Sequence, residues 1–230
     1  MKTFDSALQE KIQKAGNIAV VVVDDAAKAA PLAEALYEGG IRVMELTLRT
    51  PAALEALRVA VKAIPEMAIG AGTVLTPDQV RQAQDAGAAF AVAPGFNPRV
   101  VKTAIETELS FAPGVMTPSE IEGAVEMGCT LLKFFPAGSL GGLKTLSTMA
   151  APYLHLNLRY IPLGGITAET TAEYLRHPII AACGGSWIAT ADLIHNSDWD
   201  AIRANAKTAT DIARTTRGSC SPSNPSPKWS

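Results

Sequence analysis

Short runs of apolar and β-branched residues alternate along most of the chain with segments of helical period. The runs cover residues 18–23, 42–48, 67–74, 90–95, 110–115, 130–136, 159–166 and 179–187. Residues 51–64 illustrate the helical spacing, because Leu54, Leu57, Val61 and Ile64 recur at three or four positions on one helix face. Residues suited to helix ends punctuate the pattern: Pro51, Pro77, Pro98 and Pro118 in first turns, and Gly39, Gly40, Gly87 and Gly128 at C-caps. The pattern predicts eight strands, each followed by a helix.

Strands that alternate with helices pair in parallel through right-handed crossovers. Eight such units close into a (β/α)₈ barrel, whereas a doubly wound sheet usually has fewer strands and a glycine-rich loop after the first. The first run here ends in Val-Asp-Asp-Ala-Ala instead. We therefore predict a single (β/α)₈ barrel over residues 1–214, with an additional N-terminal helix in 1–16 that caps its bottom. The last outer helix begins at Trp199, and the Ser/Pro-rich residues 215–230 are expected to form a flexible tail.

Composition narrows the class of protein. Hydrophobic residues make up 48% and charged residues 18%, the formal net charge is −2, and basic residues form no dense cluster. These values argue against a nucleic-acid or membrane-surface protein, and no apolar run approaches the ~20 residues that span a bilayer. Three cysteines without metal-type spacing indicate a reducing compartment, with the cytoplasm as the simplest location: Cys129, Cys183 and Cys220. Three histidines are expected at the surface, and we predict no metal site: His155, His177 and His195.

Lys133 stands inside the apolar run Thr-Leu-Leu-Lys-Phe-Phe-Pro-Ala-Gly, residues 130–138, where an aliphatic side chain would be less costly to bury. Side chains alternate along a strand, so Glu45 and Lys133 project into the same barrel mouth if both face inward. One interpretation is an ion pair that holds the strands together. Burying two charges rarely stabilises a fold more than apolar residues do, which weakens that interpretation.

The second interpretation is imine chemistry. A lysine in apolar surroundings gives up its proton more readily and can then attack a ketone. The iminium ion that follows accepts electrons when the carbon–carbon bond one position further along is cleaved. Glu45 would move the protons, because carbinolamine formation, dehydration and cleavage each need a general acid or base.

The remaining polar residues at predicted strand ends suit a small anionic keto acid. Arg49 offers a planar fork for a carboxylate and Thr73 a neighbouring hydroxyl, although alone they could be a solvated loop charge and a turn residue. The glycines in 164–165 and 184–186 follow the last two predicted strands, where barrels often hold phosphate on backbone N–H groups. Each glycine pair alone could serve only a tight turn.

Six motifs occur in order along the chain: Glu-Leu-Thr-Leu-Arg-Thr (45–50), Gly-Ala-Gly-Thr-Val-Leu (70–75), Ala-Pro-Gly (93–95), Pro-Gly-Val (113–115), Lys-Phe-Phe-Pro-Ala (133–137) and Gly-Gly-Ile (164–166). Together they resemble the 2-keto-3-deoxy-6-phosphogluconate (KDPG) aldolase family of the Entner–Doudoroff pathway. The resemblance runs in register from about residue 10 to 210.

The resemblance implies a class I aldolase without metal or cofactor, which splits KDPG into pyruvate and glyceraldehyde 3-phosphate. It implies that Lys133 forms the Schiff base and Glu45 carries the proton. The substrate-binding residues that it implies are Arg49 and Thr73 at the carboxylate, Pro94 and Phe135 along the pocket, and Gly164, Gly165, Gly185 and Ser186 at the phosphate. Relatives are typically homotrimers, and they often also cleave 4-hydroxy-2-oxoglutarate into pyruvate and glyoxylate.

Leu163 departs from the family pattern. Gluconate-type members usually carry Thr at this position, which is associated with the choice of aldehyde face, and the galactonate-type relative carries an apolar residue. One alternative is therefore a 2-keto-3-deoxy-6-phosphogalactonate-type aldolase with altered or relaxed stereoselectivity. From a different class, a non-catalytic phosphosugar-binding barrel would use Lys133 and Glu45 only as a structural pair.

Overall fold

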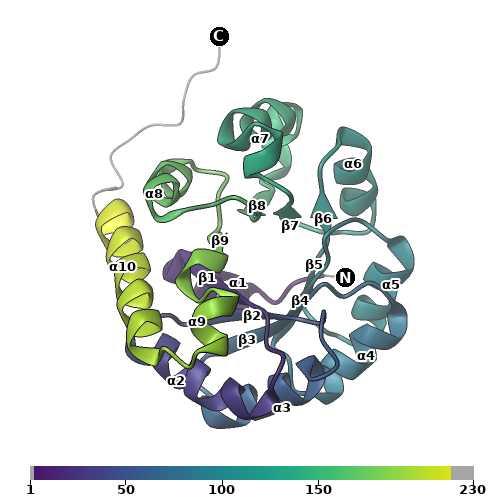
Figure 1. The fold of residues 1–230 in the computed structure, drawn as a ribbon. Coiled ribbons are helices and arrows are strands. Elements are labelled where there is room, and N and C mark those ends of the chain that lie inside the picture. The colour runs from purple at the N-terminus through teal and green to yellow at the C-terminus, as the bar shows by residue number, and fades with distance from the viewer. Residues whose placement is uncertain (1–2, 219–230) are drawn as a thin grey trace.

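The structure, a computed structural model, describes residues 3–218 and contains parallel strands surrounded by helices (Figure 1). The strands are β1 (Asn17–Val21), β2 (Val43–Thr47), β3 (Ala68–Gly72), β4 (Phe90–Val92), β5 (Phe111–Ala112), β6 (Gly114–Val115), β7 (Leu131–Phe134), β8 (Arg159–Pro162) and β9 (Cys183–Gly185). All of these lie within the predicted apolar runs except the first residue of β1, Asn17.

The strands form the wall of a barrel. A six-stranded sheet has the order β5-β4-β3-β2-β1-β9, and a three-stranded sheet has the order β6-β7-β8. On one side the two sheets are joined through the chain between β5 and β6. On the other side the Tyr160 N–H donates to the Ile179 carbonyl, and the Ala181 N–H donates to the Tyr160 carbonyl. The predicted (β/α)₈ barrel is confirmed.

The fifth predicted strand, 110–115, is interrupted at Pro113 and forms both β5 and β6. Ala112 pairs with Val92 of β4, whereas Gly114 pairs with Lys133 of β7. Proline has no N–H to donate, so the strand breaks its ladder at this residue. The Pro113 carbonyl still accepts a hydrogen bond from the Lys133 N–H. Residues 110–115 thus occupy one position in the barrel wall, with their first half paired to β4 and their second half paired to β7.

Helices cover the outside of the wall (Figure 1): α2 (Ala29–Glu38), α3 (Ala53–Ala63), α4 (Pro77–Asp85), α5 (Pro98–Glu106), α6 (Pro118–Glu126), α7 (Gly142–Ala150), α8 (Ala168–Arg176), α9 (Ala191–His195) and α10 (Trp199–Gly218). Pro77, Pro98 and Pro118 open their helices, as predicted, because proline has no N–H that would go unpaired there. Pro51 lies two residues before α3, which begins at Ala53.

The buried face of α3 differs from the predicted one. Its fully buried residues are Ala53, Ala56, Leu57 and Ala60, so only Leu57 of the predicted apolar face is fully buried. Alanines allow the helix to approach the strands closely, and the larger apolar side chains pack along its flanks. The spacing of the apolar residues predicted the helix, but it did not predict which helix face lies against the strands.

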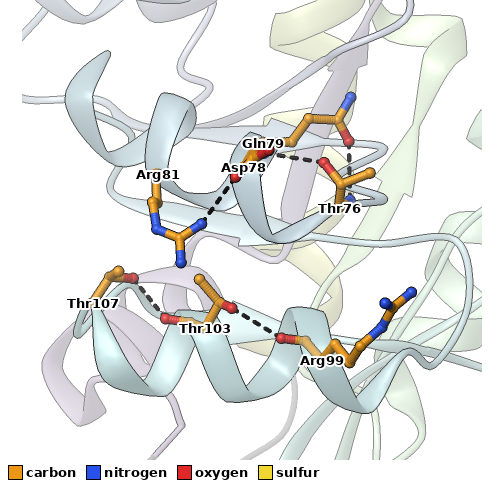
Figure 2. Close-up of polar contacts among 7 residues, drawn as sticks. All are labelled: Thr76, Asp78, Gln79, Arg81, Arg99, Thr103 and Thr107. Carbon is orange, nitrogen blue, oxygen red and sulfur yellow. Dashed lines mark hydrogen bonds and ion pairs between the residues drawn. The ribbon is translucent and has the colours of Figure 1, made fainter.

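Side-chain hydrogen bonds fix the start of α4, and a separate set lies along α5 (Figure 2). The Thr76 hydroxyl accepts from the Gln79 N–H, and Oε1 of Gln79 accepts from the Thr76 N–H. These two hydrogen bonds form a capping box. At the end of α5 the hydroxyl of the C-cap residue Thr107 donates to the Thr103 carbonyl, one turn back along the helix. The chain between β3 and α4 is therefore held where it leaves the barrel wall.

The barrel encloses its own apolar core, separate from the layer between strands and helices. The interior is filled by Phe4, Ile12, Ile18, Val43, Ala68, Phe90, Val92, Ala112, Leu131, Ile161, Leu163, Ala181 and Ala182. Two of these residues come from the N-terminal segment: Phe4, and Ile12 of α1 (Ser6–Ala15). The additional N-terminal helix is thus confirmed, and its fully buried Ile12 contributes to the interior core.

Both predicted terminal segments extend beyond the described residues. Residues 1–2 of the expected N-terminal helix lie outside that range. The expected tail was to begin at residue 215, but α10 continues through Gly218, and the Arg217 guanidinium donates to the Ala181 carbonyl at 2.7 Å. The rest of the expected tail, 219–230, lies outside the described residues. Over residues 3–218, no helix combines the length and apolar character that crossing a membrane requires.

Candidate active site

The Lys133 amine and the Glu45 carboxylate meet inside the barrel. Nζ of Lys133 donates to Oε1 of Glu45 at 2.9 Å, and the two side chains are only 6% and 2% exposed. Glu45 lies in the middle of β2 and Lys133 in β7, on opposite sides of the ring of strands. Strand alternation from the interior residues Val43 and Leu131 points both side chains inward.

This pair is costly to bury and costly to break. Removing two charges from water is repaid only in part by their attraction, and apolar residues of similar volume often stabilise a core at least as well. Removing one partner of a buried pair typically costs about 3–5 kcal/mol, because it leaves a charge without compensation. The pair is therefore poorly explained by fold stability alone, and the site's chemistry must account for it.

Gly72 leaves the space that the Glu45 carboxylate occupies. A Cβ atom built on Gly72 would lie 2.2 Å from Oε1 and 2.7 Å from Cγ of Glu45. Any other residue at the end of β3 would push the carboxylate out of its position beside Lys133. The glycine in the Gly-Ala-Gly-Thr motif is thus explained by close approach.

Thr47 connects the buried strand β2 to Arg49 at the rim. Its hydroxyl donates to the Val21 carbonyl at 3.1 Å and accepts from Nε of Arg49 at 3.2 Å. Arg49 is exposed, and in the part of the chain that the structure describes no carboxylate forms an ion pair with its guanidinium. The remaining N–H groups of Arg49 are therefore not engaged by a protein carboxylate and suit an anionic ligand.

Thr73, directly after β3, has a left-handed backbone with φ of 58°. This region costs a non-glycine residue about 1–2 kcal/mol, and a β-branched residue there is a genuine outlier. Such strain persists only where the surroundings hold it, and it clusters at functional sites. The left-handed turn places Thr73 at the cavity.

A cavity of about 150 Å³ lies above the pair. Its lining consists of Val20, Glu45, Thr47, Arg49, Thr73, Pro94, Lys133, Phe135, Leu163, Gly164, Gly184 and Ser186. The structure thus brings together all of the predicted site residues except Gly165 and Gly185, which do not line the cavity.

Sequence reasoning placed Gly184 in the glycine segment suited to phosphate, but it gave no role at the site to Val20 or Thr47. Strand alternation could have found Thr47, which shares the inward face of β2 with Glu45, and Val20, which shares the face of Ile18. Gly184 is in contact with Leu163, because a Cβ at this position would lie 2.3 Å from Cγ of Leu163. No signal in the sequence indicates that contact.

Cys129 and Cys183 are buried, and burial raises the pKa of the Cys129 thiol to about 11 and that of Cys183 to about 12. Cys220 lies outside the described residues. Among the histidines, His155 and His195 are exposed, but His177 is half-buried, which corrects the prediction. Burial lowers the pKa of His177, and its Nδ1 has no hydrogen-bond partner among residues 3–218.

Taken together, the cavity offers an amine and a carboxylate in hydrogen-bond contact, so a proton can pass directly between them. The Phe135 ring centroid lies 5.6 Å from Nζ of Lys133, within the range of a cation–π contact. A cationic rim at Arg49 and the hydroxyls of Thr73 and Ser186 complete it. This arrangement suits nucleophilic attack on the carbonyl carbon of a small anion.

Comparison with known proteins identifies one family. The family model described as KDPG and KHG aldolase matches residues 8–205. The 2-dehydro-3-deoxy-phosphogluconate aldolase of Treponema pallidum is 44% identical over 195 residues, which cover 85% of this chain and 92% of the relative. The KHG/KDPG aldolase of Escherichia coli K12 is 37% identical, covering 93% and 100%. A crystal structure of a KDPG aldolase from Legionella pneumophila, with pyruvate captured at low pH as a covalent carbinolamine intermediate, aligns with a TM-score of 0.83 and 37% identity, covering 87% and 97%.

We predict that Gly72→Ala lowers the free energy of unfolding by about 1–3 kcal/mol, because the added methyl group overlaps the Glu45 carboxylate inside a packed barrel. Urea unfolding followed by circular dichroism measures the loss. Gly95→Ala is the matched control, since a Cβ at Gly95 has no atom within 4 Å, and it should change stability by no more than about 0.5 kcal/mol. Equal losses in the two variants would contradict this account of Gly72.

Proposed function

Because the chain belongs to the KDPG and KHG aldolase family, we propose that its Lys133 and Glu45 carry out a class I aldol cleavage of KDPG. The protein is an aldehyde-lyase that splits KDPG into pyruvate and glyceraldehyde 3-phosphate. The observation that carries the choice of residues is the buried 2.9 Å contact between Nζ and Oε1 at the cavity. The covalent pyruvate carbinolamine of the Legionella pneumophila relative supports the imine route.

The first half of the reaction joins substrate and enzyme. Glu45 takes a proton from the protonated Lys133 amine through their hydrogen bond, and the neutral nitrogen attacks the ketone carbon of KDPG. A proton then passes from this nitrogen to the former carbonyl oxygen, which completes the carbinolamine. Glu45 then returns a proton to the carbinolamine hydroxyl, which leaves as water. The product is an iminium ion between Lys133 and the substrate.

The second half breaks the carbon–carbon bond. The C4 hydroxyl of the substrate gives its proton to Glu45, and the electrons of the C3–C4 bond move to the iminium nitrogen. Glyceraldehyde 3-phosphate leaves as the aldehyde, and an enamine remains on Lys133. Protonation at C3 and addition of water release pyruvate and restore the amine.

Substrate binding follows from the groups around the cavity. Arg49, oriented by Thr47, is proposed to hold the pyruvate carboxylate together with the Thr73 hydroxyl. Pro94 and Phe135 line the wall beside them. The phosphate would bind at the segment after β8, with Gly164 and Gly165, and at the end of β9, with Gly185 and Ser186. For Gly165 and Gly185 this role rests on the family resemblance, because the two residues do not line the cavity.

The proposal also covers a second substrate, the oligomeric state and the cellular location. Cleavage of 4-hydroxy-2-oxoglutarate is supported by the KHG/KDPG aldolase of Escherichia coli, to which the chain is 37% identical. A homotrimer and a cytoplasmic location are what the family resemblance and the cysteine usage imply, and both stay predictions. Sedimentation equilibrium would test the trimer directly.

Leu163 favours a second candidate, a galactonate-type aldolase with altered or relaxed stereoselectivity. Its side chain is 4% exposed, lines the cavity and packs in the space left by Gly184. It offers shape but no hydrogen bond, whereas the gluconate-type threonine offers a hydroxyl to the bound aldehyde. A pocket that lacks this hydroxyl discriminates weakly between two epimers that differ only in where a hydroxyl points.

Sodium borohydride added with pyruvate is expected to leave a stable adduct on Lys133, because it reduces the imine to a secondary amine. Peptide mapping by mass spectrometry locates the adduct. Lys133→Met should lose both the adduct and turnover, whereas the exposed Lys102→Met should keep both. A parent protein without an adduct would remove the imine mechanism.

Glu45→Gln keeps the shape of the side chain but cannot carry protons, so turnover of KDPG should fall roughly 10²- to 10⁴-fold while pyruvate binding is retained. Steady-state kinetics with pyruvate as a competitive inhibitor measures both quantities. Glu10→Gln, on the exposed side of α1, should match the parent. Unchanged turnover in Glu45→Gln would exclude Glu45 as the proton carrier.

Leu163→Thr should raise the ratio of kcat/KM for KDPG over its C4 epimer by at least about tenfold, because the new hydroxyl can hydrogen-bond only one epimer well. Separate assays with the two phosphorylated sugar acids give the ratio. Leu154→Thr, at an exposed position that does not line the cavity, serves as the control. A ratio that does not change would mean that position 163 does not set the epimer preference.

A further inference from the structure

The segment between β3 and α4 has a distinct set of backbone contacts just after the left-handed Thr73. The Val74 N–H donates to the Val92 carbonyl at 3.1 Å. Oε1 of Gln79 accepts from the N–H of Leu75 at 2.7 Å and from that of Thr76 at 3.2 Å. Figure 2 shows Gln79 and Thr76 facing each other at the start of α4. We call these two contacts of the Gln79 side chain the Gln79 clamp.

The same device occurs a second time in the chain. Residues 72–94 and 113–135 share a pattern, with Val-Leu-Thr-Pro-Asp-Gln in the first and Val-Met-Thr-Pro-Ser-Glu in the second. In the second copy Oε2 of Glu120 accepts from the N–H of Met116 at 2.7 Å and from that of Thr117 at 2.9 Å. Both copies therefore fix the helix start with a side chain at the same repeat position.

The two copies differ at the residue before the clamped segment. Thr73 has φ of 58° and lines the cavity, whereas the equivalent Gly114 has no left-handed φ and no side chain to present. Only the first clamp therefore lies next to a residue with a strained backbone whose side chain lines the cavity. The second copy provides a natural comparison for what the clamp alone contributes.

We infer that Gln79 is a positioning residue for the cleavage reaction, which acts by holding Thr73 in its left-handed conformation. The N–H groups of residues 74, 75 and 76 are all bonded, so the chain that directly follows Thr73 is held in place and supports its left-handed conformation. Loss of the Gln79 side chain frees two of the three, and Thr73 relaxes and withdraws its hydroxyl from the cavity. The inference rests on the proposed role of Thr73 at the substrate carboxylate.

The test is Gln79→Ala, measured by steady-state cleavage of KDPG. A relaxed Thr73 weakens binding of the carboxylate in the ground state and the transition state alike, so KM should rise while kcat stays near that of the parent. The expected rise is roughly five- to thirtyfold, the factor that corresponds to the left-handed strain of one residue. Gln79→Glu should restore KM, because Glu120 fills the same role in the second copy.

Two controls separate positioning from stability. Glu120→Ala removes the equivalent clamp and should lower the melting temperature about as much as Gln79→Ala, but leave KM unchanged. In a Thr73→Ala background, Gln79→Ala should no longer raise KM, because the hydroxyl that it positions is already gone.

A KM that is unchanged in Gln79→Ala, equally raised in Glu120→Ala, or raised as much in the Thr73→Ala background would overturn the inference. So would a Gln79→Glu variant that behaves like Gln79→Ala. These outcomes differ from a failure of the proposed function, in which the parent itself neither cleaves KDPG nor forms a borohydride adduct with pyruvate.

Discussion

The hydrogen-bonded contact of Lys133 with Glu45 is the interaction on which the rest of the site depends. It joins residues that are 88 positions apart in the sequence and lie on opposite sides of the barrel, so it exists only when the whole wall is formed. The space for the Glu45 carboxylate is left by Gly72, which has no side chain. The rest of the interior is filled by apolar side chains from the strands and by Phe4 and Ile12 from the N-terminal segment. The fold thus holds the charged pair Lys133 and Glu45 against an apolar interior core.

Much of this architecture could be predicted from the sequence because its signals are local. Alternation of apolar runs and helical period gave the barrel, and strand alternation gave the shared inward direction of Glu45 and Lys133. What could not be predicted depends on contacts between distant segments. The break at Pro113 depends on which neighbour each half of the strand pairs with, and the buried face of α3 depends on how closely the helix approaches the wall. The half-buried position of His177, the contact of Gly184 with Leu163 and the left-handed Thr73 likewise require the assembled fold.

The internal repeat explains the lysine better than the apolar run alone. In the first copy the position equivalent to Lys133 is Val92, which lies in β4 and belongs to the interior core. The equivalents of Leu131 and Phe135 are Phe90 and Pro94, so both copies keep apolar residues on either side. The same repeat position is therefore occupied by an aliphatic residue in β4, two strand positions away from Lys133 in the barrel wall. Since a valine is accommodated in one copy, the amine in the other copy reflects a requirement of the reaction and not of the barrel.

The division of the wall into two sheets has a mechanical consequence. Lys133 belongs to the panel formed by β6, β7 and β8, whereas Glu45 belongs to the larger sheet. The panel borders that sheet at the strand interrupted by Pro113 and at the bridge between Tyr160 and Ile180. At the second border two backbone hydrogen bonds join Tyr160 to Ile179 and Ala181, whereas β7 and β8 pair at four positions. A tilt of the panel at this border therefore disrupts fewer backbone hydrogen bonds than a separation of β7 from β8. Such a tilt moves the amine relative to its carboxylate. The distance between Nζ of Lys133 and Oε1 of Glu45 therefore depends on how tightly the barrel is closed.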